Sequence, residues 1–231
     1  MIRAQHEAPA HPPAPGDAVG PARIMEVGLE AAIGFRVKSG WAAAVLLAGP
    51  AAAPAVIERR RVELSDPAVP ASRQPHHAAT GVARTDPAEL ERLSALVERC
   101  AREAVPPLLA RWRDAGYDLL GAGLVIGSDA VPERIANPHI RAHAAEGRLF
   151  HRVLEQAVAA AGVPCSAVVE RVLYQTLAAA AGQSPAVVKR AVAGLPREPA
   201  APWRSDQKAA AAAAWLVLVT AKTPARPEWP S

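Results

Sequence analysis

Three strand patterns follow one another between residues 32 and 64 with no helical pattern between them. Residues 32–38 alternate apolar and polar side chains, which is typical of a strand with one buried face. A Ser-Gly turn signal, and then a Gly-Pro break, separate this strand from an apolar strand over 41–48 and a third strand over 55–64. The third strand is rich in Arg and Glu, and such charge protects an exposed edge strand from pairing with other chains. The three patterns therefore predict consecutive antiparallel strands.

Helix and strand patterns alternate after residue 85. Asp86, Pro87 and Glu89 provide an N-cap, a first-turn proline and a capping carboxylate, so a helix is expected to begin there. Pro106 and Pro107 are expected to kink or break that helix. A strand over 119–126, a helix over 137–161, a short strand over 166–169 and further helices up to residue 221 follow. The order β-β-β-α-β-α-β-α predicts an α/β fold in which a mixed five-stranded sheet carries helices on both faces.

Composition divides the chain into one domain and two tails. Residues 1–25 are rich in Pro, Ala and Gly and are expected to be a disordered tail, residues 26–222 form the domain, and residues 223–231 form a flexible C-terminal tail. Inside the domain, 65–85 reads as a long loop without secondary structure of its own. Aromatic residues are only 4% of the chain, so Ala, Val and Leu must fill the core. We attribute the Ala-rich runs to the codon usage of a GC-rich genome and do not take them as evidence of anything special.

Net charge and cysteine content indicate which partners and which cellular compartment to expect. The formal net charge is +4, which permits a polyanionic partner without the concentrated basic stripe of a dedicated nucleic-acid binder. Cys100 and Cys165 lie far apart, so a cysteine zinc site is not expected and a reduced, cytoplasmic setting is the expectation. No segment has the apolar length of a membrane span, and the N-terminus lacks the pattern of a signal peptide, so no membrane partner is expected.

Two short segments carry a family resemblance. Residues 33–36 read Ile-Gly-Phe-Arg, and residues 205–210 read Ser-Asp-Gln-Lys-Ala-Ala. Together with the element order, they resemble the ribonuclease H-like superfamily, in particular its resolvase-like branch, in which the first strand reads Ile-Gly-x-Asp. The resemblance implies a nucleic-acid partner and divalent metals held by carboxylates. Asp206 matches an acid of the last helix and Asp129 lies near that of the fourth strand, but Arg36 replaces the first metal-binding Asp and Lys208 replaces another acid.

The helix over 137–161 carries a second candidate for metal binding. His139, His143 and Glu146 stand at positions i, i+4 and i+7, so they share one face of the helix. Imidazole and carboxylate groups suit zinc or another transition metal, and Asp129 offers a fourth ligand, with Mg²⁺, Mn²⁺ and Zn²⁺ all open as the cofactor. The alternative is that these residues are ordinary polar groups near a helix N-terminus, paired with one another or with arginines.

Several cations are candidates for phosphate contacts. Arg141 and Arg148 share another face of the same helix, and Arg73 stands near His76 and His77 in the long loop. The resemblance adds Arg36 and Lys208 as phosphate contacts. The alternative is a solvated basic surface, because no aromatic residue is interleaved to stack bases.

Three functions remain open for this chain, which we interpret as a cytoplasmic protein of bacterial type. As a nuclease it would use Asp129, Glu146 and Asp206 as acids around a metal, with His143 as a ligand or proton-transfer group. As a degenerate member of the same fold it would bind nucleic acid or a protein partner without catalysis, which Arg36 favours. A small-molecule enzyme would place a closed apolar cavity beside His143. The number of acidic and His side chains that converge at the carboxyl ends of the central strands distinguishes the first two.

Overall fold

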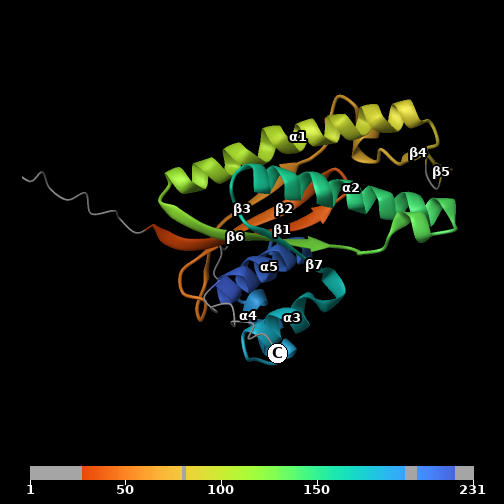
Figure 1. The fold of residues 1–231 in the computed structure, drawn as a ribbon. Coiled ribbons are helices and arrows are strands. Elements are labelled where there is room, and N and C mark those ends of the chain that lie inside the picture. Colours follow the sequence, from red (N-terminus) through yellow and green to blue (C-terminus); the bar gives the residue numbers. More distant parts are fainter. Residues whose placement is uncertain (1–27, 80–81, 196–201, 222–231) are drawn as a thin grey trace, which may run out of the picture.

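The computed structural model describes residues 28–79, 82–195 and 202–221. Within these ranges a five-stranded sheet has the strand order β3-β2-β1-β6-β7 (Figure 1). Its strands are β1 (Leu29–Lys38), β2 (Trp41–Ala48), β3 (Ala55–Glu63), β6 (Tyr117–Ile126) and β7 (Cys165–Val169). The predicted tails over 1–25 and 223–231 lie outside the described residues.

Strand direction divides the sheet into two halves. β1 pairs antiparallel with β2, and β2 pairs antiparallel with β3. On the other side of β1, β6 and then β7 run parallel to it. β1 and β6 are aligned so that Arg36 faces Val125, which brings their carboxyl ends to the same edge of the sheet. The chain therefore has the mixed α/β sheet of the ribonuclease H-like fold that the element order predicts.

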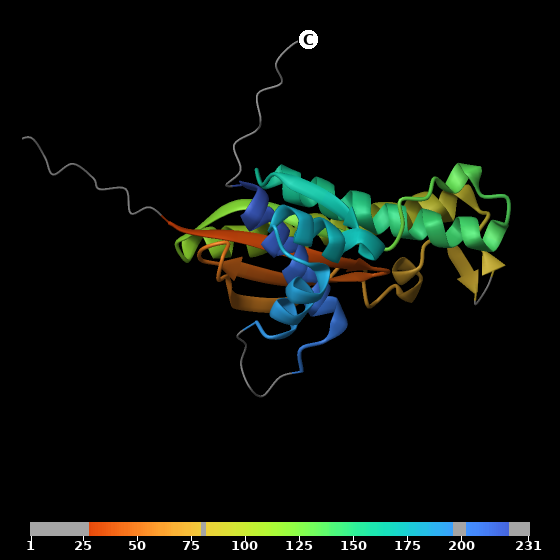
Figure 2. The same cartoon turned by 90° about the horizontal axis from the view of Figure 1, so that it is seen from below.

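Helices cover both faces of the sheet (Figures 1 and 2). On one face lie α1 (Pro87–Asp114) and α2 (Pro138–Ala160), which pack against each other and against a core that contains Ile33, Phe35 and Leu124. On the other face lie α3 (Leu173–Ala180), α4 (Pro185–Ala193) and α5 (Ser205–Ala221). Among the described residues, no helix combines the length and the apolar character needed to cross a bilayer.

The alanine run of α5 has a packing function, which corrects our attribution of such runs to codon usage. Ala209–Ala214 are all buried, and α5 contacts β1, β6 and β2. The helix comes so close to the sheet that a Cβ added at Gly34 would stand 1.7 Å from the carbonyl oxygen of Ala210, and one added at Gly123 2.7 Å from that of Ala213. Only small side chains on the helix and glycines on the strands permit this distance.

Helix α1 continues through Pro106 and Pro107, so the two prolines do not break it. The two prolines cannot donate to the carbonyls of Arg102 and Glu103, four residues earlier. Both of those residues are exposed, so their carbonyls lie on the solvent side of the helix, where water can replace the missing donors. Packing of the apolar face of α1 on the sheet holds the helix together across this gap.

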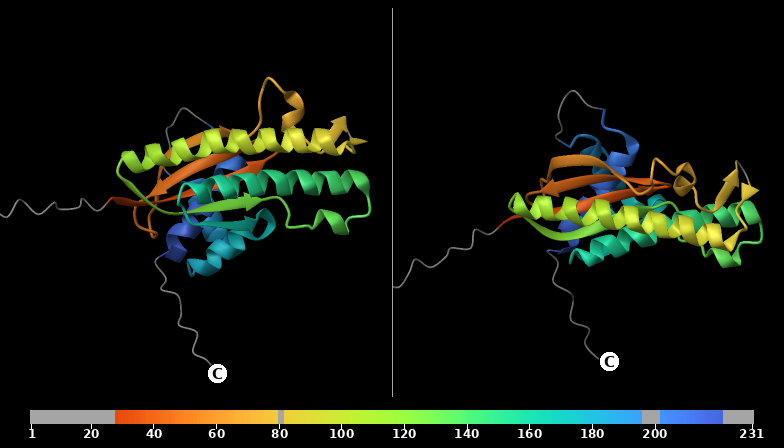
Figure 3. Two further views of the ribbon diagram at one scale, coloured as in Figure 1. Left: turned by 45° about the horizontal axis from the view of Figure 1, so that its top comes forward. Right: turned by 90° about the horizontal axis from the view of Figure 1, so that it is seen from above.

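The segment 65–85 also differs from the prediction of a loop without secondary structure. It contains a short 3-10 helix, η1 (Pro70–Arg73), and two short antiparallel strands, β4 (His77–Ala79) and β5 (Val82–Ala83). Arg84, which follows β5, donates to the carbonyls of Pro75 and His77 and so holds β4 and β5 together. Figure 3 shows β4 and β5 beyond the end of the sheet, beside the N-terminal parts of α1 and α2. The strands are too short for a period-2 pattern to reveal them.

Candidate functional site

The position that would hold the first metal-binding acid of the fold holds a buried cation. Arg36 is only 6% exposed and lies near the carboxyl end of β1. Its guanidinium donates to the backbone oxygen of Val37 at 2.6 Å and to Oε2 of Glu170 at 2.5 Å. Glu170 directly follows β7, so it reaches Arg36 across the end of β6. Sequence reasoning missed Glu170, although a carboxylate at the end of a predicted parallel strand was a usable signal.

A second ion pair occupies the last helix of the fold. Asp206, in the first turn of α5, lies 3.3 Å from Nζ of Lys38 at the end of β1. Asp129 lies apart, with an exposed side chain 4.0 Å from Arg171. Lys208 is half-buried in the first turns of α5. Each acid near the carboxyl ends of the central strands is therefore opposed by a cation.

These residues do not fit the paired divalent metals that the fold family implies. Two metal ions need several free carboxylates around them, and a buried guanidinium beside them would repel both. Here Arg36 and Lys38 neutralise Glu170 and Asp206. No reaction step through a metal pair can be derived from this arrangement.

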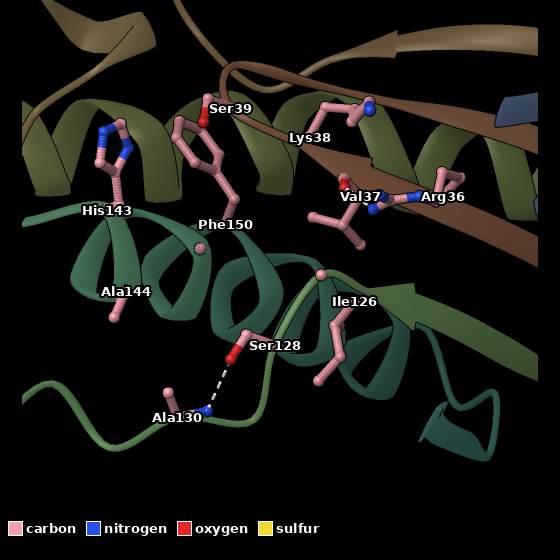
Figure 4. Close-up of a pocket in the computed structure, with 12 residues that line it drawn as sticks. Arg36, Val37, Lys38, Ser39, Ile126, Ser128, Ala130, His143, Ala144 and Phe150 are labelled. Atoms are coloured by element: carbon pink, nitrogen blue, oxygen red, sulfur yellow. Dashed lines mark hydrogen bonds between the residues drawn. The ribbon is translucent and has the colours of Figure 1, made fainter. Parts of the chain in front are cut away.

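A cavity of about 240 Å³ opens at the same edge of the sheet. Figure 4 shows Arg36, Lys38 and Ser39 on the β1 side, His143 and Phe150 on α2, and Ser128 after β6. None of the residues that line this cavity carries a carboxylate. Its polar groups are two hydroxyls, an imidazole and two cations that are each paired with a carboxylate outside the lining, so it is not the closed apolar pocket of a small-molecule enzyme.

Three histidines come together beside this cavity. His77 of β4 meets His139 and His143 of α2, and each offers one ring nitrogen such that the three nitrogens lie within 4.8 Å of one another. The Nε2 atoms of His139 and His143 are 3.1 Å apart. His77 is buried, His139 is half-buried and His143 is exposed, so the group opens from the protein interior toward solvent.

Glu146 stands behind this group. Its side chain is only 2% exposed, and its Oε2 accepts the backbone N–H of His76 at 2.9 Å and lies 3.3 Å from Nδ1 of His77. Burial raises the pKa of Glu146 to about 8, against the opposing effects of the His76 N–H and Arg84. Burial, together with the neighbouring His143 and His139, lowers the pKa of His77. Both effects favour the neutral form of His77, which is the form that binds metals.

The structure thus brings only some of the predicted metal ligands together. His139 and His143 share one site, Glu146 contacts His77 from behind, and Asp129 is not part of the cluster. His77 is the member that the stripe on the helix did not reveal. The signal for it was the His-His pair in the long loop, but nothing local in the sequence shows that this loop folds back onto α2.

The predicted phosphate contacts are spread over the surface. Arg141 is exposed and lines a shallow hollow with His76 and Arg84. Arg148 is exposed and lies 3.3 Å from Glu133, and Arg73 is exposed at the end of η1. Of the cations singled out in the sequence, only Arg36 lines the cavity at the sheet edge.

No family model and no curated protein matches this chain. Among solved structures, Thermus thermophilus RuvC in complex with a Holliday junction substrate matches at 16% identity and a TM-score of 0.47, over 81% of this chain and 91% of that one. A second T. thermophilus RuvC structure matches at 17% identity and a TM-score of 0.44, over 80% and 92% of the two chains. The Aquifex aeolicus member of the Ppx/GppA family matches at 12% identity and a TM-score of 0.35, over 66% and 40%. The fold class follows from the strand order and helical layers of this chain itself.

Proposed function

We propose that this protein binds the phosphate backbone of nucleic acid at the sheet edge, and that it does not use the two-metal chemistry of its fold. The observation that carries this proposal is the cavity at the carboxyl ends of β1 and β6, which Arg36 and Lys38 line and no carboxylate enters. A site that holds metal cations needs the opposite charge. The exchange of acids for cations converts a metal-binding edge into an anion-binding one.

The geometry of the cations supports a phosphate ligand. Glu170 and the carbonyl of Val37 hold the Arg36 guanidinium in place, so little side-chain entropy is lost when an anion binds. Lys38 also lines the cavity and is partly exposed, so its ammonium group can contact an anion while it stays 3.3 Å from Asp206. Ser39 and Ser128 add hydroxyl donors. The resemblance to the resolvase-like branch selects nucleic acid among the ligands that carry phosphate.

Lys38→Glu is expected to weaken binding to DNA at least about tenfold at low salt, because it removes one phosphate contact and adds a repelling charge. Fluorescence anisotropy with labelled branched, double-stranded and single-stranded DNA, at two salt concentrations, measures this change. Lys189→Glu is the matched control: it makes the same charge change on an exposed residue of α4, away from the cavity. Equal losses in both variants, or none in Lys38→Glu, would contradict binding at this edge.

A second candidate function is phosphodiester hydrolysis with a single metal ion. The observation that favours it is His143, which both lines the cavity and belongs to the histidine group. A metal there would lie beside bound phosphate and activate water. In this second function Glu146 would orient His77 and would not bind the metal itself. Asp129 and Asp206 would not act as acids around the metal, because each lies next to a cation.

Cleavage of the same DNAs in the presence of Mn²⁺ or Zn²⁺ tests this second function. The expected result is cleavage by the wild-type protein and its loss in His143→Ala. Intact DNA after incubation with metal-loaded wild-type protein would leave the binding function and exclude hydrolysis of these substrates.

A further inference from the structure

We propose that His77, His139 and His143 form a binding site for a single transition-metal ion, with zinc as the best fit, and that Glu146 positions His77 within it. This site involves none of the carboxylate positions of the fold family. It also stands apart from the proposed nucleic-acid binding, which needs no metal.

The ring nitrogens have the spacing of metal ligands. Two ligands of a tetrahedral zinc ion with bonds of about 2.0–2.1 Å are roughly 3.3 Å apart. The Nε2 atoms of His139 and His143 are 3.1 Å apart, and the third nitrogen lies within the same 4.8 Å group. Positions i and i+4 on one helix place the two imidazoles side by side on the same face. Two of the three ligands thus come from α2, and the third comes from β4.

The third ligand shows the strongest sign of a missing partner. Nδ1 of His77 lies against Oε2 of Glu146, whereas Nε2 of His77 is buried and has no hydrogen-bond partner. The ring is only 8% exposed, so water does not replace that partner freely. An unsatisfied buried polar atom is costly in a folded protein. A metal ion bound to this nitrogen removes that cost.

Glu146 has the position of a carboxylate that orients a metal-bound histidine. In many metal sites the ring nitrogen opposite the metal donates to a carboxylate, which fixes the tautomer and strengthens the ligand. Glu146 has this position toward His77, with Oε2 3.3 Å from Nδ1, and Oε2 also accepts the backbone N–H of His76. A buried Glu on the apolar side of α2 has no packing advantage, so its contact with His77 explains its presence.

The chemistry of the ligands selects the metal. Three imidazoles suit Zn²⁺, Co²⁺, Ni²⁺ or Cu²⁺, whereas Mg²⁺ prefers oxygen ligands. Three protein ligands leave one coordination position open, as in catalytic zinc sites. His143 also lines the cavity at the sheet edge, so this cavity could supply water or an anion to the open position. The metal would also join β4 to α2, because its ligands come from both.

Isothermal titration of the metal-stripped full-length protein with Zn²⁺, and the visible absorption of its Co²⁺ form, test this site. We expect one ion per chain and a tetrahedral Co²⁺ spectrum. Both should be lost in His143→Ala and in His139→Ala, which remove rings that are not fully buried and therefore spare the fold. Glu146→Gln should keep the one-to-one stoichiometry but weaken affinity by about 10- to 100-fold.

His151→Ala is the matched control, because it removes a histidine from the same helix that is not in the group. It should leave Zn²⁺ binding unchanged. The proposal is overturned if folded wild-type protein binds no Zn²⁺, or if His143→Ala binds as tightly as the wild type. In that case His139 and His143 form only a histidine–histidine hydrogen bond. Anisotropy with DNA in the presence of a chelator reports on nucleic-acid binding separately, so either proposal can fail alone.

Discussion

Gly34→Ala is expected to prevent stable folding. The added Cβ would stand 1.7 Å from the carbonyl oxygen of Ala210, 2.6 Å from its carbonyl carbon and 2.8 Å from the backbone nitrogen of Ala214. All three atoms belong to the backbone of α5, so no side chain can rotate away. The helix would have to leave the sheet and expose its row of buried alanines. We expect a loss of more than about 4 kcal/mol, a large share of the stability of an ordinary domain.

Urea unfolding followed by circular dichroism measures this loss, and Gly147→Ala is its control. A Cβ at Gly147 meets nothing within 4 Å, and this glycine lies inside α2. The control should stabilise the protein by about 0.5–1 kcal/mol, because alanine is the better helix former. If the free energy of unfolding of Gly34→Ala lies within about 1 kcal/mol of the wild-type value, then α5 does not lie this close to β1.

Arg36→Asp is expected to destabilise the protein and not to create a metal site. The change restores the acid that the resolvase-like branch carries on its first strand. In this chain, however, the new carboxylate would be buried beside Glu170, which now accepts from Arg36. Two carboxylates placed together without a cation repel each other, and the backbone oxygen of Val37 loses its donor. We expect a loss of about 1–3 kcal/mol, less than for a fully buried pair from which one partner is removed, because the side chain of Glu170 is 49% exposed.

Two further variants separate charge from size at this position. Arg36→Met keeps an unbranched apolar chain in place of the arginine stem. It leaves Glu170, whose side chain is 49% exposed, to be solvated, so it should cost less than Arg36→Asp. The double change Arg36→Glu with Glu170→Arg exchanges the charges and should recover part of the stability. Urea unfolding with and without Mg²⁺ compares all of them. An Arg36→Asp protein that is as stable as the wild type and gains stability from Mg²⁺ would contradict this view of the sheet edge.

Local patterns were sufficient to predict the fold. The three strands before residue 64, the later strand–helix alternation and the cap at Asp86 all appear in the structure. Asp86 accepts the N–H groups of Ala88 and Glu89 as the capping signature predicts. Such features depend on residues within a few positions of one another, so a single sequence contains the information.

Other elements could not be read from local patterns. The strands β4 and β5 are too short to show a period, and the two prolines of α1 would end an isolated helix. Here the apolar face of α1 on the sheet outweighs the lost hydrogen bonds. The alanines of α5 carry no hydrophobic pattern because the helix is buried between the sheet and α3 and α4.

The sequence by itself therefore determined the elements, their order and the helix face that carries His139 and His143. Only the tertiary structure decided which side chains meet. Arg36 and Glu170 are 134 residues apart, and His77 and Glu146 are 69 residues apart. Periodicity and capping act over one or two turns of chain, whereas these pairs form because strand order and loop closure bring distant segments together. Strand order therefore decides the charge balance at the sheet edge, and loop closure brings the third histidine to the proposed metal site.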